Sequence, residues 1–141
     1  MLQDHVFIYN FMDLKLVLQI DTAPNPRGLC CLCASAKNPV VACPGASKGE
    51  VRARRRLLPA HPPTLCQVRI ELLSQRKTAL VAAHDNQLAA LALAHDGSKL
   101  ATASQKGTIV RIFDCATALP LRELRRGSTS ASLYVNRSSS H

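Results

Sequence analysis

Two adjacent arginines closed by a glycine, in Leu124-Arg125-Arg126-Gly127, carry the clearest chemical signal of this sequence. Guanidinium groups bind phosphate oxygens through paired hydrogen bonds, so these residues favour an anion-binding site. The motif is short, however, and most arginine pairs are simply solvated. The residues that precede it must decide between the two interpretations.

The composition permits one folded domain with an anionic partner. The chain has 141 residues, 47 % of them apolar and 19 % charged, which is enough for one core. Aromatic residues make up 4 % and tryptophan is absent, so the core must be aliphatic. The net charge of +9 favours phosphate head groups or nucleic acid as partners.

Part of the positive charge lies in residues 51–66, which hold four arginines and three prolines without a strand period. We interpret this segment as a disordered insertion. A basic tether to nucleic acid or to an acidic membrane is the alternative, but a solvated insertion explains the composition equally well. We therefore expect no nucleic-acid partner.

Other classes of function leave little trace in the sequence. The six cysteines lack the paired spacing of a zinc module, so we expect buried free thiols and no metal or other cofactor, rather than a disulfide framework. No paired carboxylates, activated nucleophile or phosphate-binding glycine loop indicates an enzyme. Without a signal peptide or a long apolar run, we expect a cytoplasmic protein with peripheral membrane contact.

Short strands are the elements that must position the arginines. Alternating or β-branched runs predict strands at residues 5–9, 14–20, 29–34 and 39–43, which we expect to form one antiparallel sheet. Two more are predicted at residues 67–73 and 78–82. Because residues 128–141 are rich in serine, we expect a disordered tail there.

Residues 83–127 show the same pattern of short strands and turns with greater regularity. Strands are predicted at residues 88–93, 99–104, 108–113 and 120–124, with turns at Asp96-Gly97 and Gln105-Lys106-Gly107. A helix at residues 88–94 is the alternative because alanine favours helices, but the flanking turns favour a strand.

This unit resembles one blade of a WD-repeat β-propeller. His84 and Ser104 stand near the positions of the structural histidine and serine of such repeats, while Phe113 replaces the usual tryptophan and Lys106 a frequent aspartate. The hydrogen-bonded tetrad of an orthodox repeat is therefore incomplete.

Several motifs occur in a fixed order along the chain: Ile8-Tyr9-Asn10, Asn25-Pro26-Arg27-Gly28, Cys43-Pro44-Gly45, Ala83-His84-Asp85, Leu100-Ala101-Thr102-Ala103-Ser104, Lys106-Gly107-Thr108, Arg111-Ile112-Phe113 and Leu124-Arg125-Arg126-Gly127. Together they resemble one family of propellers, the PROPPINs, which include the WIPI and autophagy-related proteins and bind phosphoinositides. The plant and algal members are the most similar.

The resemblance implies an all-β fold, a partial propeller of about two to three blades from a seven-bladed family. Residues 1–50 would supply N-terminal propeller strands, 51–66 the disordered insertion, 67–127 the blades and 128–141 the tail. A truncated ring leaves apolar blade faces open, which predicts marginal stability.

The resemblance also implies two lipid sites that share the arginine pair. The first would use His84, Thr102, Ser104, Gly107, Thr108, Arg111 and Arg125. Arg126, followed by Gly127, would face the second site, whose other ligands come from a later blade. His84 and Ser104 serve the blade structure in the alternative interpretation, and Arg111 is then plain surface.

The function implied is binding of phosphatidylinositol 3-phosphate and 3,5-bisphosphate, with recruitment of autophagy proteins to the phagophore or to endosomal and vacuolar membranes. A protein-interaction scaffold without lipid binding is one alternative. A non-functional truncated product is another.

Overall fold

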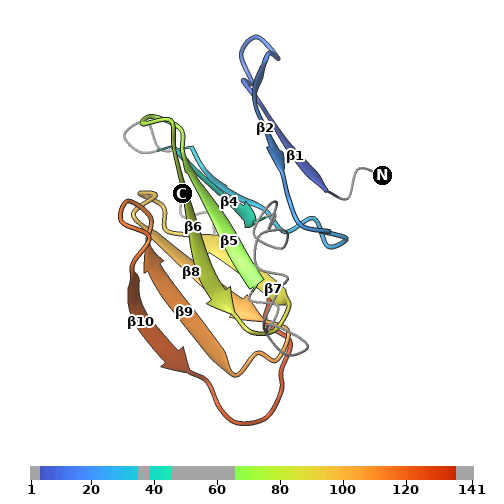
Figure 1. Cartoon of the computed structure of the whole chain (residues 1–141), viewed down its shortest axis with the longest axis vertical. Helices are drawn as coiled ribbons and strands as arrows, with labels where there is room; N and C mark the ends of the chain where they lie inside the picture. The colour runs from blue at the N-terminus through green and yellow to red at the C-terminus, as the bar shows by residue number, and fades with distance from the viewer. Residues whose placement is uncertain (1–3, 35–38, 46–65, 136–141) are drawn as a thin grey trace, which may run out of the picture.

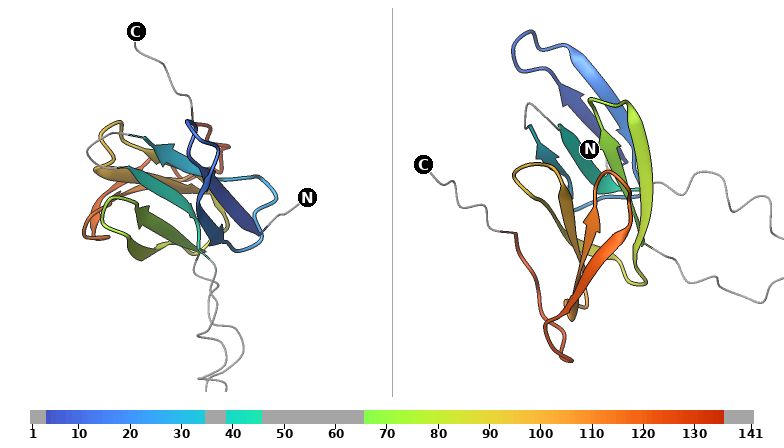
Figure 2. Two further views of the ribbon diagram at one scale, coloured as in Figure 1. Left: turned by 90° about the horizontal axis from the view of Figure 1, so that it is seen from above. Right: turned by 90° about the vertical axis from the view of Figure 1, so that its left-hand side faces the viewer.

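The computed structural model describes residues 4–34, 39–45 and 66–135. These residues form ten β-strands and no helix, arranged in three antiparallel sheets that follow one another in chain order (Figures 1 and 2). None of the described segments is a helix with the length and hydropathy needed to cross a membrane. The fold is all-β, as expected from the sequence.

The first sheet is a hairpin of β1 (His5–Tyr9) and β2 (Leu16–Asp21). Its turn is closed by a hydrogen bond of 2.8 Å from the Asn10 amide to the Lys15 carbonyl, and Leu14 adopts a φ of 53°. The prediction of two strands joined by a short turn is confirmed. In Figure 1 this hairpin is drawn in blue and forms a sheet of its own.

The next four strands form a sheet of their own, in the order β3-β4-β5-β6. They are β3 (Cys31–Cys33), β4 (Val40–Pro44), β5 (Cys66–Leu72) and β6 (Lys77–His84). We call this the first blade. All its neighbouring strands are antiparallel.

The prediction that the first four strands share one sheet is wrong, because β1 and β2 pair only with each other. The chain turns between β2 and β3, where the Asn25 side chain bonds both the amide and the carbonyl of Leu29. Ile20 of the hairpin then packs face to face against Val41 and Cys43 of the first blade. Burial of these side chains, rather than strand pairing, joins the two sheets.

The last four strands form the second blade, in the order β10-β9-β8-β7. They are β7 (Leu88–Leu93), β8 (Lys99–Ser104), β9 (Ile109–Asp114) and β10 (Pro120–Arg125). Gly97 and Gly107 take φ values of 71° and 65° in the two predicted turns, a conformation that glycine adopts without strain. The four predicted strands are confirmed, and the helical alternative for residues 88–94 is wrong.

The main core lies between the two blades. Ile70 and Val68 of the first blade belong to the same buried cluster as Leu91, Leu100 and Phe113 of the second. This cluster fixes how the two blades face each other, and it therefore sets the relative positions of side chains at their junction.

The six cysteines are free thiols, and the prediction that they are buried is confirmed for four of them but wrong for Cys30. Cys31, Cys33, Cys43 and Cys115 are buried, whereas Cys30 is exposed. Burial raises the pKa of Cys43 to about 12 and that of Cys115 to about 11. These two thiols are therefore unreactive at neutral pH.

Two predicted disordered segments fall partly within the described residues. Of residues 51–66 only Cys66 is described, and it begins β5 instead of ending a loop. Residues 128–135 form no strand, but the Ala131 amide donates to the Lys106 carbonyl at 3.3 Å. That part of the tail therefore contacts the second blade.

Candidate anion-binding site

Polar side chains form a row across one face of the second blade. Thr102 of β8 pairs with Arg111 of β9, and Arg111 pairs with Glu123 of β10. Directly paired residues of antiparallel strands lie on the same face. Arg125 follows Glu123 by two residues and so shares that face. We call this row, with His84, the junction site, since the same face carries Leu100 and Phe113 of the core between the blades.

His84 reaches the site from the first blade. It ends β6, and its Nε2 lies 3.0 Å from Oγ1 of Thr102. Both residues are buried. By resemblance to WD repeats, His84 and Ser104 stand near the positions of the structural histidine and serine. In the structure, however, the hydroxyl that His84 contacts is that of Thr102. Since the two residues come from different blades, their contact ties the blades together.

Burial lowers the pKa of His84, and the nearby positive charge of Arg111 opposes protonation further. Asp85 and Glu123 act in the other direction without reversing the shift. The imidazole is therefore neutral at pH 7, and it can offer an anion a neutral hydrogen bond but no charge.

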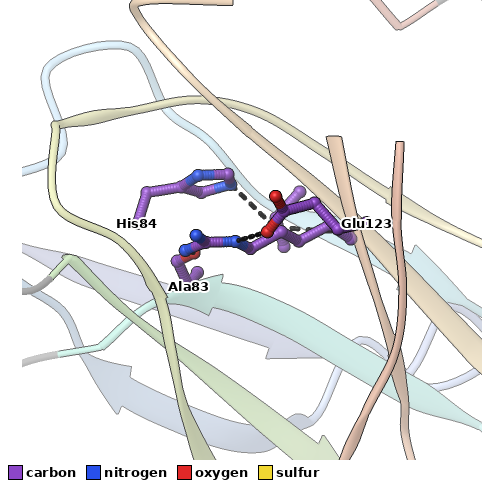
Figure 3. A network of polar contacts seen from close by, with 5 residues as sticks. Ala83, His84 and Glu123 are labelled. Carbon is purple, nitrogen blue, oxygen red and sulfur yellow. Dashed lines mark hydrogen bonds and ion pairs between the residues drawn. The ribbon is translucent and has the colours of Figure 1, made fainter. Parts of the chain in front are cut away.

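Arg111 also links the two blades. Its Nη1 donates to the Ala83 carbonyl at 2.6 Å, and its Nε donates to Oε2 of Glu123 at 2.9 Å. Figure 3 shows Ala83, His84 and Glu123 gathered around this network. Among the described residues Nη2 makes no hydrogen bond. Arg111 is thus partly engaged and has one donor group left for a ligand.

The two arginines of the motif differ sharply. Arg125 is exposed and makes no side-chain hydrogen bond or ion pair within the described part of the chain. Arg126 is engaged: its Nε donates to the Gly107 carbonyl at 2.8 Å, and its Nη2 donates to the Thr129 carbonyl. Arg125 is the last residue of β10, whereas Arg126 follows the strand and is held by the turn before β9 and by the tail.

Gly107 and its neighbours serve the turn before β9. The Gly107 amide donates to the Ser104 carbonyl at 2.9 Å, so it is not free to bind a phosphate oxygen in this conformation. A Cβ at Gly107 would lie 1.8 Å from the Ala131 carbonyl oxygen. Ser104 and Thr108 are buried, and the Thr108 carbonyl accepts the Arg126 amide.

Gly127 has open space around its Cα. A Cβ added there would meet no atom within 4 Å. The glycine of the motif is therefore not required by close packing in the described part of the chain.

Of the predicted residues, the structure brings to one face or into contact His84, Thr102, Ser104, Arg111 and Arg125. Sequence reasoning missed Glu123 and the Ala83 carbonyl. The signal for Glu123 was its alternation with Arg125, which puts both on one face of a strand. Its pairing with Arg111 depends on the register between β9 and β10, which a single sequence does not give.

A separate hollow of about 760 Å³ lies between β3, β7 and residues 133–135. Its lining includes Leu29, Leu91 and Tyr134 and contains no charged residue. The junction site, which carries arginines, suits an anion better than this hollow does.

No group of three or more potential metal ligands occurs among residues 4–34, 39–45 and 66–135.

The amino-acid sequence of the chain is similar to those of known proteins. Residues 1–140 match the model of the PROPPIN family. The chain is 36 % identical over 133 residues to autophagy-related protein 18e of Arabidopsis thaliana, covering 94 % of this chain and 31 % of that protein. It is 38 % identical over 128 residues to WD repeat domain phosphoinositide-interacting protein 2 of Xenopus laevis, covering 89 % of this chain and 26 % of that protein.

Solved structures show the same fold. Hsv2p of Kluyveromyces lactis superposes with a TM-score of 0.67 at 22 % identity, covering 92 % of this chain and 35 % of that one. A complex of KlAtg21 with the coiled coil of AgAtg16 gives a TM-score of 0.66 at 25 % identity, covering 92 % and 39 %. The described strands thus form part of a β-propeller. The chain spans between 26 % and 39 % of the length of these proteins.

Proposed function

The chain belongs to the PROPPIN family, and on that premise we propose that its junction site binds the phosphate of a phosphoinositide head group. A relative named as phosphoinositide-interacting is 38 % identical to it. We propose phosphatidylinositol 3-phosphate and 3,5-bisphosphate as the lipids. The chain covers about a third of the length of autophagy-related protein 18e. Every function that a complete propeller performs is therefore a proposal for this chain.

One observation carries the proposal: Arg125 is exposed and unpaired within the described residues, on the face where Arg111 keeps Nη2 free. A guanidinium group without a hydrogen-bond partner in the protein can bind phosphate without first breaking another contact. The neutral imidazole of His84 and the hydroxyls of Thr102 and Ser104 would add hydrogen bonds at the blade junction.

A second phosphate site at Arg126 and Gly127 requires a rearrangement. Arg126 must first leave the carbonyls of Gly107 and Thr129 that it now binds. Anion binding by Arg126 therefore competes with the hydrogen bond that joins Arg126 to Thr129 of the tail. We propose that Arg125 contributes more than Arg126 to phosphate binding by this chain. Gly107 and Thr108 would contribute indirectly, by shaping the turn before β9.

At the cellular level we propose a cytoplasmic protein of autophagy, without enzymatic activity, that attaches peripherally to phagophore, endosomal or vacuolar membranes. Relatives in plants and fungi carry the name autophagy-related protein 18. One solved neighbour, KlAtg21, is in complex with a coiled coil of AgAtg16. Recruitment of autophagy proteins to the membrane is the corresponding proposal for this chain.

Co-sedimentation with vesicles tests the lipid site. Binding to phosphatidylcholine vesicles should require phosphatidylinositol 3-phosphate, weaken with salt and be lost in Arg125→Ala. Arg122→Ala is the matched control, since Arg122 is an exposed arginine of the same strand that pairs with Ile112 on the opposite face. Binding by Arg125→Ala equal to that of the parent chain would show that the proposal is wrong.

A further inference from the structure

A serine follows the arginine pair directly after its glycine, in Arg125-Arg126-Gly127-Ser128. The two arginines thus stand three and two residues before a hydroxyl group. Protein kinases select their substrates partly by charge pattern, and a serine preceded by arginines at these distances suits a kinase with an acidic substrate site. The proposed function uses the arginines but gives this serine no role.

Ser128 is accessible to another protein. It is exposed, as are Thr129 and Ser130, and all three lie outside the strands. Strand β10 ends at Arg125 and is the outermost strand of its sheet. Ser128 makes no hydrogen bond within the described part of the chain, and a Cβ at Gly127 would meet no atom within 4 Å. A kinase can therefore reach the hydroxyl without unfolding a blade.

A phosphate on Ser128 would lie beside the arginines. Nη2 of Arg126 donates to the carbonyl of Thr129, the residue after Ser128, so this guanidinium group already lies against the backbone there. Arg125 is three residues from Ser128, which limits the distance between their Cα atoms to about 11 Å. The extended side chains of arginine and phosphoserine together can span that distance.

Phosphate is a stronger partner for these arginines than their present contacts. A phosphoserine carries a charge of about −1.5 to −2 and three acceptor oxygens. Paired hydrogen bonds between guanidinium and phosphate are stronger than single ones to a neutral carbonyl, and the Arg126 side chain now bonds the carbonyls of Gly107 and Thr129. Arg125 has no side-chain partner within the described residues. The chain's own phosphate would therefore hold the arginines that the lipid needs.

We infer that Ser128 is a phosphorylation site for a kinase that selects basic substrates, and that its phosphate excludes the lipid phosphate from the arginine pair. In the reaction, the hydroxyl oxygen of Ser128 forms a bond to the γ-phosphorus of ATP. The bond from that phosphorus to the bridging oxygen breaks, ADP leaves, and the hydroxyl proton passes to a base of the kinase. This inference rests on the proposed function, since it needs a lipid phosphate at Arg125.

A general effect of negative charge is the competing explanation, because any negative charge added to a basic chain weakens its attraction to an anionic membrane. Ser128→Glu and Gln75→Glu separate the two explanations. Each variant adds one negative charge at an exposed position, and Gln75 lies in the turn between β5 and β6 of the first blade. Ser128→Glu should weaken vesicle binding more than Gln75→Glu does.

The experiment treats the whole chain with ATP and a serine kinase that selects basic substrates, and it maps the product by mass spectrometry. Ser128 should be phosphorylated. The product should bind vesicles of phosphatidylcholine and phosphatidylinositol 3-phosphate about five- to fifty-fold more weakly, from repulsion between two phosphates roughly 7 Å apart with and without salt screening. Removal of the phosphate by a phosphatase should restore binding.

Two results would show that this inference is wrong while the lipid site stands. In the first, the kinase leaves Ser128 unmodified in the folded chain. In the second, binding is lost in Arg125→Ala, yet phosphorylation of Ser128 leaves it unchanged, or Gln75→Glu weakens it as much as Ser128→Glu. If the parent chain binds no phosphatidylinositol 3-phosphate, or Arg125→Ala binds it equally well, the proposed function fails and the competition at the arginines fails with it.

Two controls assign the effect to the phosphate on Ser128. Kinase-treated Ser128→Ala should bind vesicles like the untreated parent chain, and a loss of binding there would assign the effect to another phosphorylated residue. The urea midpoint of the phosphorylated chain should match that of the parent, because Ser128 is exposed and lies outside the strands. A lower midpoint would attribute the lost binding to unfolding and overturn the inference.

Discussion

The two blades share one topology but differ in what covers their faces. Ile70 of β5 and Ile112 of β9 occupy corresponding positions on corresponding strands, yet Ile70 is fully buried and Ile112 only partly. The first blade packs against the hairpin on one face and the second blade on the other. The second blade has such a neighbour on one face only, within the described residues.

The outermost strands show the same contrast. Three of the last four residues of β6 are buried, whereas every residue of β10 is exposed, including Leu121 at 51 % and Leu124 at 47 %. A blade therefore does not bury its apolar residues by itself. Burial comes from the adjacent blade, as expected for a repeat architecture.

The largest expected effect comes from truncating the two equivalent isoleucines. Ile70→Ala should lower the free energy of unfolding by about 2–5 kcal/mol, because it leaves a cavity between the blades. Ile112→Ala should cost about 1 kcal/mol or less at its partly exposed position. Urea unfolding followed by circular dichroism measures both. Equal losses would mean that the face of the second blade is covered in solution.

The ion pairs of the two blades provide the second test. Glu71 of the first blade is buried, with its side chain 7 % exposed, and it accepts hydrogen bonds from Arg69 and Thr78. Glu71→Gln should cost about 1–3 kcal/mol, because a buried network loses its charged acceptor. Glu123→Gln in the second blade should change stability by less than about 0.5 kcal/mol.

Unfolding midpoints in urea compare the two variants. If both glutamates contribute equally to stability, burial is not what separates the two ion pairs. The contrast between the blades would then be restricted to apolar side chains.

The third test concerns the turn of the second blade that contacts the tail. Gly107→Ala should cost about 1–2 kcal/mol, because its φ of 65° disfavours a side chain. The Cβ would also displace the Ala131 carbonyl, which lies 1.8 Å from its position. Limited proteolysis should then cut residues 128–135 faster.

Gly127→Ala is the control, since it meets no atom within 4 Å and should be nearly neutral. Similar proteolysis of the two variants would show that the contact between Ala131 and Gly107 does not hold the tail to the blade.

The smallest effect is the pH dependence at the junction between the blades. Burial lowers the pKa of His84 below 6.5, so the unfolded chain takes up a proton there before the folded chain does. The stability contributed by the neutral imidazole is therefore complete above pH 6.5 and decreases as the pH falls below it.

Urea unfolding between about pH 7.5 and 5.5 should show this decrease in the parent chain and a flatter profile in His84→Asn. Asp96 and Asp114, whose pKa values are lowered by hydrogen bonds from Ser98 and Thr117, titrate below 3.8 and do not contribute in this window. A decrease of equal size in His84→Asn would assign the pH dependence to another group.

The strands and turns of this protein could be predicted from its amino-acid sequence. Alternating apolar residues and glycine turns such as Asp96-Gly97 predicted the strands of both blades, because side-chain period and turn conformation are local properties. The ordered motifs also determined the family. They selected His84, Thr102, Arg111 and Arg125 as candidate ligands, through resemblance.

Which strands share a sheet, and which side chains are in contact, became known from the three-dimensional arrangement alone. Pairing of β1 and β2 apart from β3 and β4, and the contact of His84 with Thr102, depend on how the sheets pack. The opposition of Arg111 to Glu123 depends on strand register. Packing and register are set by burial of residues far apart in the chain, which local sequence patterns do not contain.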